Sequence, residues 1–192
     1  MFNHRRGLWG YSGMAADSQL LTIQSTGMGG PSAAIVSEEL IALGARRLIR
    51  IGTCGALVDD LELGAIVAPR AVLPADGASI ALGAAEPIHP DPRLLAGLLA
   101  AGALPVSAAS SDLFYDPRED VGAQWTGKGV QVVEMEAATI LRVAQRAGVD
   151  AACVLAVSDV PAAEGARRAS DGQLEELGVR VGRTAYAALT AA

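Results

Sequence analysis

The sequence predicts a single α/β domain in which a central mixed β-sheet is flanked by helices on both faces. Three observations lead to this prediction. The chain has 192 residues, of which 51% are hydrophobic and only 4% aromatic, and this suits one compact core of Ala, Val, Leu and Ile. Apolar runs of strand length alternate with segments that carry apolar residues at helical spacing. Those runs are almost continuously hydrophobic, as expected for strands buried on both faces.

The predicted elements follow one another without a low-complexity linker or an internal repeat. The first strand covers 20–24 and leads into the glycine turn TGMGGPS. A helix with apolar residues at spacings of four and three then begins at Pro31 or Ser32 and ends before Gly44. The remaining elements are strands at 48–51, 65–68, 71–73, 106–109, 130–133 and 151–157, and helices at 92–101, 137–147 and 173–189.

Composition and charge argue against several classes of protein. The net charge of −6 disfavours a nucleic-acid surface, although a few arginines can still form a local anion site. No apolar run reaches the roughly 18 residues that a membrane-spanning helix needs, and the first residues lack the apolar core of a signal peptide. Cys54 and Cys153 lie in apolar stretches and are expected to be reduced core residues, with a disulfide or metal pair as the alternative. We therefore expect a cytoplasmic protein.

Unusual polar residues gather where the predicted strands end. These stretches are TGMGG at 26–30, RIGTCG at 50–55, SSDLFY at 110–115, EME at 134–136 and SDV at 158–160. In α/β sheets, ligands bind beyond the carboxyl ends of the strands. Because five strand ends carry such residues, the sequence predicts a small-molecule site there.

Two of these stretches have the composition of an anion site, and each has a structural alternative. The turn that ends at Gly30 either presents backbone N–H groups to an anion at a helix N-terminus or is only a tight strand-to-helix turn. Arg50 lies inside an apolar strand, where a guanidinium is unfavourable unless an anion or an acid compensates it. Together with Thr53 it suits a phosphate; alternatively, it forms an ion pair with a core glutamate.

Glu134 and Glu136 flank Met135 where a buried strand passes into a helix. One interpretation is that the two acids only complement the helix dipole. In an extended stretch, however, a spacing of two places both on one side. Two carboxylates can accept hydrogen bonds from vicinal hydroxyls, and a methionine can pack against a sugar face. The pattern therefore favours a ribose site.

Ser158 and Asp159 end another buried strand, and two interpretations of the acid remain open. Asp159 is either a helix N-cap or a general acid whose pKa is raised by burial. Only the second interpretation gives this residue a chemical role.

Taken together, these stretches resemble the nucleoside phosphorylase family, in the trimeric and hexameric branch that includes purine nucleoside phosphorylase, uridine phosphorylase and the methylthioadenosine/adenosylhomocysteine nucleosidases. The resemblance covers essentially the whole chain and rests on STGMGGPS, RLIRIGTCGAL, SSDLFY, VVEMEAATI and AVSDV, in family order. It implies the phosphorylase/hydrolase-like fold, with phosphate as co-substrate and no metal or organic cofactor. It also implies a homo-oligomer built from dimers, with a hexamer favoured.

The resemblance assigns roles to individual residues. Phosphate-binding roles fall to Gly30, Arg50, Thr53 and, from a neighbouring subunit, Arg6. Nucleoside-binding roles fall to Phe114 beside the base and to Val133, Glu134, Met135, Glu136 and Ser158. The catalytic residues are Asp159, which protonates or hydrogen-bonds N7 of a purine, and a helper arginine, Arg168 or the adjacent Arg167.

The predicted activity is phosphorolysis of purine nucleosides to the free base and ribose 1-phosphate. The Gln and Arg with which uridine phosphorylases read uracil are replaced here by Arg118 and Asp120. One alternative is a hydrolytic nucleosidase of the methylthioadenosine/adenosylhomocysteine type, against which Arg50 argues. The other is a non-catalytic relative.

The N-terminal stretch around Arg6 adds two expectations. The chain is expected to lack the family's first strand and its Gly-Asp-Pro-x-x-Arg phosphate loop, either because the protein is short or because the sequence starts at an internal methionine. Arg6 is expected to complete a partner's site, since a central strand at 20–24 would keep it from its own. Trp9 and Tyr11 are expected at that contact.

Overall fold

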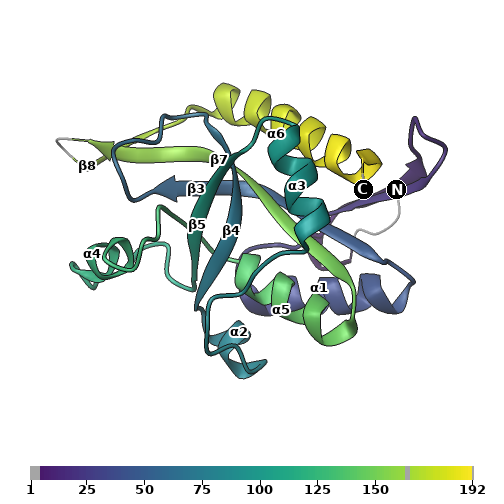
Figure 1. The fold of residues 1–192 in the computed structure, drawn as a ribbon, viewed down its shortest axis with the longest axis horizontal. Helices are drawn as coiled ribbons and strands as arrows, with labels where there is room; N and C mark the ends of the chain where they lie inside the picture. The colour runs from purple at the N-terminus through teal and green to yellow at the C-terminus, as the bar shows by residue number, and fades with distance from the viewer. Residues whose placement is uncertain (1–4, 163–164, 192) are drawn as a thin grey trace.

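The computed structural model describes residues 5–162 and 165–191 and confirms the predicted mixed α/β architecture (Figure 1). The strands are β1 (Gly10–Met14), β2 (Leu20–Gln24), β3 (Arg47–Ala56), β4 (Ile66–Ala75), β5 (Leu104–Ser111), β6 (Val132–Glu134), β7 (Asp150–Ala162) and β8 (Gly165–Arg168). The helices are α1 (Gly30–Ala42), α2 (Gly77–Ala81), α3 (Pro92–Ala100), α4 (Val121–Thr126), α5 (Ala137–Ala147) and α6 (Asp171–Ala191), and a 3-10 turn covers Arg5–Gly7.

Five strands of the main sheet form a closed ring. Their order is β3-β6-β5-β4-β7, and β7 pairs back onto β3. The β3–β7, β4–β5 and β5–β6 pairs are parallel, whereas β3–β6 and β4–β7 are antiparallel. The mixed sheet was predicted, but its closure was not. Beyond the ring, β7 continues and pairs with β8 in an antiparallel arm (Figure 1).

Helices cover both faces of this sheet, as the sequence predicted. In Figure 1, α3 and α6 lie on one side and α1 and α5 on the other. Side chains of β7 alternate between the two layers: Leu155 and Val157 belong to the cluster with Leu141 of α5, and Val154 belongs to the cluster with Leu98 of α3. Because both faces of β7 are buried, its sequence is almost continuously apolar.

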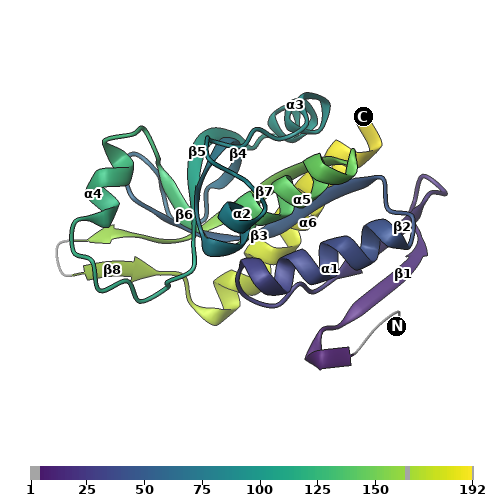
Figure 2. The ribbon, with the colours of Figure 1, turned by 90° about the horizontal axis from the view of Figure 1, so that it is seen from below.

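The strand at 20–24 has the predicted bounds, but it does not hold the central position that the argument on Arg6 took as its condition. Within the described residues, β2 pairs with β1 alone, in a two-stranded antiparallel ribbon outside the main sheet (Figure 2). Apolar side chains stand exposed on both faces of the ribbon, for example Leu20 on one and Ile23 on the other. Periodicity identified a strand, but it contained no information on the partner. The argument that a central strand separates Arg6 from its own site therefore loses its premise.

Several strands are longer than the sequence indicated. The predicted strands 65–68 and 71–73 are one strand, β4, with an irregular register between Pro69 and Ala71. The strand predicted to end at Ile51 instead runs on to Ala56. Glycines usually weaken a strand, but here they make room for side chains that lie over the backbone. A Cβ on Gly52 would lie 2.6 Å from Nη1 of Arg50.

The two cysteines are core residues, as expected. Cys54 and Cys153 are both free thiols in the cluster that packs against α5. Burial raises the pKa of both thiols well above the usual range. In the described parts of the chain, we find no helix with both the length and the hydrophobicity needed to cross a bilayer.

Candidate functional site

Arg50, Glu134 and Glu136 form a buried ion cluster at the centre of the candidate site. Arg50 Nε donates to Glu134 Oε2 at 2.8 Å, and Arg50 Nη2 lies 2.5 Å from Glu136 Oε2. The three side chains are 10%, 0% and 7% exposed. The ion pair that the sequence left open as an alternative is therefore formed, and with both glutamates. Whether Arg50 also binds phosphate stays a prediction.

The positive charge of Arg50 is stabilised by its acidic neighbours. Burial favours the neutral form of the guanidinium, but the carboxylates, with Glu134 foremost, outweigh this and raise the pKa of Arg50 above its usual value. No hydrogen bond to the described residues uses Arg50 Nη1, which lies over Gly52. This group remains available as a donor to a ligand.

Glu134 is surrounded by donors. Besides Arg50, its carboxylate accepts hydrogen bonds from the Ser110 hydroxyl, from the Glu136 N–H at 2.9 Å and from the Ala137 N–H at 2.9 Å. The last two donors belong to the start of α5, where the helix dipole also favours an anion. These contacts saturate Glu134, so the structure gives it the position of a support for Arg50 and Glu136.

Glu136 joins the ion cluster to the glycine turn. Its Oε1 accepts the Gly29 N–H at 2.5 Å, and the residue is only 5% exposed. Burial raises the pKa of Glu136, and Arg50 and the Gly29 N–H oppose this effect while the charge of Glu134 adds to it. Each carboxylate oxygen has two lone pairs, so Glu136 can still accept hydrogen bonds from a ligand.

The glycine turn requires its glycines for two different reasons. Gly29, the N-cap of α1, has φ 86° and ψ 157°, which a residue with a side chain rarely adopts. At Gly30 the reason is steric instead, because a Cβ there would lie 2.7 Å from Thr139 Oγ1 and 2.8 Å from Asp76 Oδ2. The start of α1 is therefore packed tightly against α5 and against the segment after β4.

Gly30→Ala is expected to lower the free energy of unfolding by about 1–3 kcal/mol, because an added methyl group overpacks this contact. Urea denaturation measures the change. Gly178→Ala is a matched control, since a Cβ on this residue of α6 meets nothing within 4 Å. That control should gain about 0.5–1 kcal/mol from helix propensity. A Gly30→Ala protein that gains stability in the same way would contradict the packing described here.

Asp159 and Arg168 lie opposite each other on the β7–β8 arm. They are register partners, and Arg167 is the partner of Val160. Cross-strand partners point to the same face, so Arg168 shares a face with Asp159 and Arg167 does not. The register therefore favours Arg168 as the helper arginine. Because β7 continues to Ala162, the N-cap interpretation of Asp159 is wrong.

The aromatic loop after β5 meets this arm. The Arg168 guanidinium carbon lies 5.4 Å from the centre of the Phe114 ring, within the range of a cation–π contact. Phe114 is 58% exposed and packs edge-on against Tyr115. The Ser158 hydroxyl donates to Asp159 Oδ2 at 2.9 Å. The arm and the loop thus bring together residues predicted to contact the base.

The structure joins some predicted residues to the ion cluster and leaves others apart. Met135 and Val133 adjoin Glu134 in sequence, and Val133 pairs with Gly55 and Ala109 in the sheet. By contrast, Thr53 is exposed and three residues beyond Arg50, so strand alternation places it on the other face of β3. Its phosphate role stays a prediction.

Arg6 lies outside the ion cluster as well. Its Nη1 is 3.5 Å from Glu39 Oε1 of the same chain, in a pair whose side chains are 64% and 56% exposed. An exposed pair of this kind contributes little to stability. Its role in a partner's site also stays a prediction.

Sequence reasoning missed a second group of buried polar residues behind the glycine turn. Asp76, Ser79, Ser110 and Thr139 are all fully buried and hydrogen-bonded to one another or to Glu134. The Asp-Gly pair at 76–77 was a detectable turn and cap signal. The contact between Asp76 and Thr139 joins residues 63 positions apart, and no local pattern indicates it.

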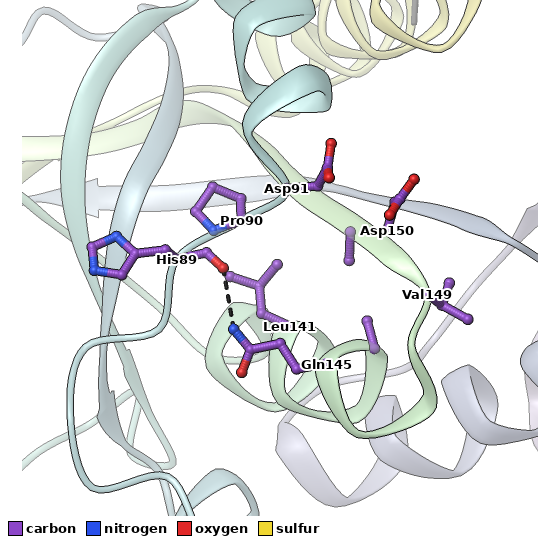
Figure 3. A pocket seen from close by; sticks show the side chains of 9 residues that line it. His89, Pro90, Asp91, Leu141, Gln145, Val149 and Asp150 are labelled. Atoms are coloured by element: carbon purple, nitrogen blue, oxygen red, sulfur yellow. Dashed lines mark hydrogen bonds between the residues drawn. The ribbon is translucent and has the colours of Figure 1, made fainter.

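A hollow of about 220 Å³ lies elsewhere, between the end of α5 and the starts of β7 and α3 (Figure 3). Its polar groups already have partners. Asp91 caps α3 by accepting from the N–H groups of residues 93 and 94, Asp150 pairs with Arg93 at 2.9 Å, and Gln145 donates to the His89 carbonyl at 3.3 Å. Since no predicted site residue lines this hollow, the ion cluster remains the candidate site.

Comparison with known proteins points to one family. A family model described as "Phosphorylase superfamily" matches residues 2–192. A guanosine phosphorylase of Halorubrum lacusprofundi is 36% identical over 150 residues, or 73% of this chain and 61% of that protein. A DeoD-type purine nucleoside phosphorylase of Jannaschia sp. is 36% identical over 168 residues, or 82% and 70%. A uridine phosphorylase of Salmonella typhimurium is 33% identical over 163 residues, or 73% and 64%. The chain thus matches less than two thirds of the length of the guanosine and uridine enzymes.

Proposed function

Because this chain belongs to the phosphorylase superfamily, we propose that it catalyses the phosphorolysis of purine nucleosides to the free base and ribose 1-phosphate. The observation that carries the proposal is the buried Arg50, which is held by two glutamates and whose Nη1, over Gly52, makes no hydrogen bond to the described residues. A guanidinium in this position suits a phosphate nucleophile. With water as the nucleophile, the guanidinium would serve only as the counterion of the two glutamates.

In the proposed mechanism the residues of the ion cluster bind different ligands, Glu136 the ribose and Arg50 the phosphate. Glu136 accepts hydrogen bonds from the ribose hydroxyls with the lone pairs that Arg50 and Gly29 leave free. Phosphate accepts hydrogen bonds from Arg50 Nη1 and from the backbone at the start of α1, where the helix dipole favours an anion. Glu134 holds Arg50 and the first turn of α5 in place.

The bond changes occur at C1′ of the ribose. The C1′–N9 bond breaks, its electron pair goes to the purine, and Asp159 donates a proton or a hydrogen bond to N7. Arg168, the register partner of Asp159, lies over the Phe114 ring in the structure, and its proposed role is to hold the carboxyl group of Asp159 when a purine is bound. A phosphate oxygen then forms a bond to C1′, which has gained oxocarbenium character. Positioning and electrostatics supply most of the rate enhancement, so phosphate is the only co-substrate that is needed.

A purine substrate is supported by the relatives and by the loop sequence. Two of the relatives named above are a guanosine and a purine nucleoside phosphorylase, at 36% identity each. Arg118 and Asp120 occupy the positions at which uridine phosphorylases are expected to carry Gln and Arg. The cytoplasmic location stays a prediction.

The decisive assay incubates the purified chain with inosine or adenosine, with and without phosphate, and identifies the sugar product. We expect ribose 1-phosphate and no turnover without phosphate. Free ribose formed at the same rate in both conditions would support the hydrolytic alternative. No consumption of either nucleoside in the presence of phosphate would support the non-catalytic alternative.

Glu136→Gln is expected to reduce kcat/KM for nucleosides roughly ten- to hundredfold, because a neutral amide is a weaker acceptor for two hydroxyls. Affinity for the free base, measured by calorimetry, should change far less. Glu38→Gln, on the exposed side of α1, is the control and should behave as the wild type. Equal losses for nucleoside and free base would indicate that Glu136 acts only through the ion cluster.

We also propose a homo-oligomer built from dimers, with Arg6 completing a neighbour's phosphate site. Tyr11 and Ile23, on one face of the β1–β2 ribbon, are 56% and 62% exposed, and Trp9 beside them is 54% exposed. Exposed aromatic and apolar residues are typical of protein interfaces. Sedimentation at micromolar concentration should therefore give a species larger than the 19.5 kDa chain. A homogeneous monomer would exclude the role proposed for Arg6.

A further inference from the structure

Asp76 is a fully buried carboxylate that the proposed mechanism does not use. It lies between β4 and α2 and is 0% exposed. Ser79 donates to it twice, through its N–H at 2.9 Å and its hydroxyl at 2.5 Å. A third donor, the Thr139 hydroxyl in the first turn of α5, lies 2.6 Å from Asp76 Oδ2. Three donors offset the unfavourable burial of the acid and fix its position.

The start of α1 packs on the same group. A Cβ on Gly30 would lie 2.7 Å from Thr139 Oγ1, 2.8 Å from Asp76 Oδ2 and 2.9 Å from Ala78 Cβ. The backbone of Gly30 therefore rests directly on the hydrogen bond between Asp76 and Thr139. The first residues of α1, α2 and α5 all meet at this point.

This meeting point adjoins the contact between the glycine turn and Glu136. Gly29, the residue before Gly30, donates its N–H to Glu136 Oε1 at 2.5 Å. Glu136 precedes Thr139 by three residues, which is about one turn of α5. The glycine turn and Glu136 are thus linked twice: by their own hydrogen bond, and through the packing of Gly30 on Asp76 and Thr139.

We propose that Asp76 and Thr139 are positioning residues, which set the distance between the glycine turn and Glu136. The identity of the two ligands, phosphate at the turn and ribose at Glu136, rests on the proposed function. The geometry does not depend on it. If the hydroxyl of Thr139 is removed, Thr139 and Asp76 are no longer joined, the surface on which Gly30 packs can shift, and both ligands lose their alignment together.

The test compares three variants of the full chain. Thr139→Val removes the hydroxyl and keeps the shape of the side chain, whereas Thr139→Ser keeps the hydroxyl. Ser79→Ala is the matched control, because it removes another donor from the same carboxylate without touching α1 or α5. Thr139→Ala replaces Thr139→Val in the comparison if the valine variant does not fold.

The first measurement is amide hydrogen exchange, by mass spectrometry, of a peptide that covers 26–33. In Thr139→Val we expect exchange at the Gly29 amide to be at least about tenfold faster than in the wild type, as for a locally opened hydrogen bond. Thr139→Ser and Ser79→Ala should keep the wild-type rate. If Ser79→Ala and Thr139→Val accelerate exchange equally, Asp76 acts only through overall stability, and the proposal is overturned.

The second measurement is steady-state kinetics. Thr139→Val should lower kcat/KM for phosphate and for nucleoside by similar factors, on the order of ten- to hundredfold, because small displacements of binding groups have effects of this size. Thr139→Ser should restore both values. Unchanged kinetics in Thr139→Val would overturn the proposal. If exchange responds as expected but the wild type itself consumes no phosphate, the positioning role holds and the proposed function fails.

Discussion

Arg50→Ala is expected to lose about 3–5 kcal/mol of folding free energy near neutral pH, the usual effect of removing one partner from a buried ion pair. The variant leaves the carboxylates of Glu134 and Glu136 buried without their counterion. Urea denaturation measures the loss. Arg46→Ala, at an exposed arginine just before β3, should stay within about 0.5 kcal/mol of the wild type.

The loss should also depend on pH, with a defined sign. Arg50 lowers the pKa of Glu136 in the wild type, so without it burial raises that pKa further above its value in the unfolded chain. Between the two pKa values the folded state binds more protons, so stability falls as pH rises through that window. The deficit of Arg50→Ala should therefore be smaller at about pH 5 than at about pH 8. A deficit that is the same at both pH values would contradict the buried-charge explanation.

Arg50→Ala also distinguishes phosphate binding from nucleoside binding. In the proposed mechanism the guanidinium contacts phosphate, so the variant should lose its dependence on phosphate before it loses nucleoside binding. Equilibrium binding of a nucleoside, measured in conditions where the variant is still folded, provides the comparison. A normal KM for phosphate in this variant would remove Arg50 from the phosphate site.

Asp159→Asn is expected to reduce kcat for purine nucleosides by about 10²–10⁴, the usual contribution of a general acid. An amide has no proton to give to N7, so the purine leaves as a poorer leaving group. A nucleoside already methylated at N7, such as 7-methylguanosine, does not need this proton and should lose much less. Equal losses for both substrates would mean that Asp159 only supports the β7–β8 arm.

The sequence predicted those parts of the fold that depend on local periodicity. The helix at 137–147 and the strand at 20–24 have the predicted bounds, because their apolar spacing and flanking turns were clear. Short elements with little buried surface were missed: all four residues of β8 are exposed, and β1 buries only Gly10. Closure of the ring depends on pairing between distant strands, which single-sequence patterns do not specify.

The candidate site was predictable to a similar degree. Arg50 and Glu134 were recognised because charged residues inside apolar strands are unfavourable unless they are compensated, and the structure joins them. The contact of Thr139 with Asp76 was not recognisable, because a threonine near a helix start is common. Only the structure identifies the contact, because both residues are fully buried and joined by a hydrogen bond between positions distant in sequence.

The closed ring also determines when this chain can finish folding. Its parallel β3–β7 pair joins segments that are roughly one hundred residues apart, from Arg47↔Asp150 onward. Pairing over such a separation is slow, because the entropy of a long loop is lost before the contacts form. On a ribosome, β3 must wait for almost the whole chain, and its edge stays open to unwanted strand partners during that time. The vulnerable period of this protein thus falls during its synthesis, before the last strand of the ring has emerged.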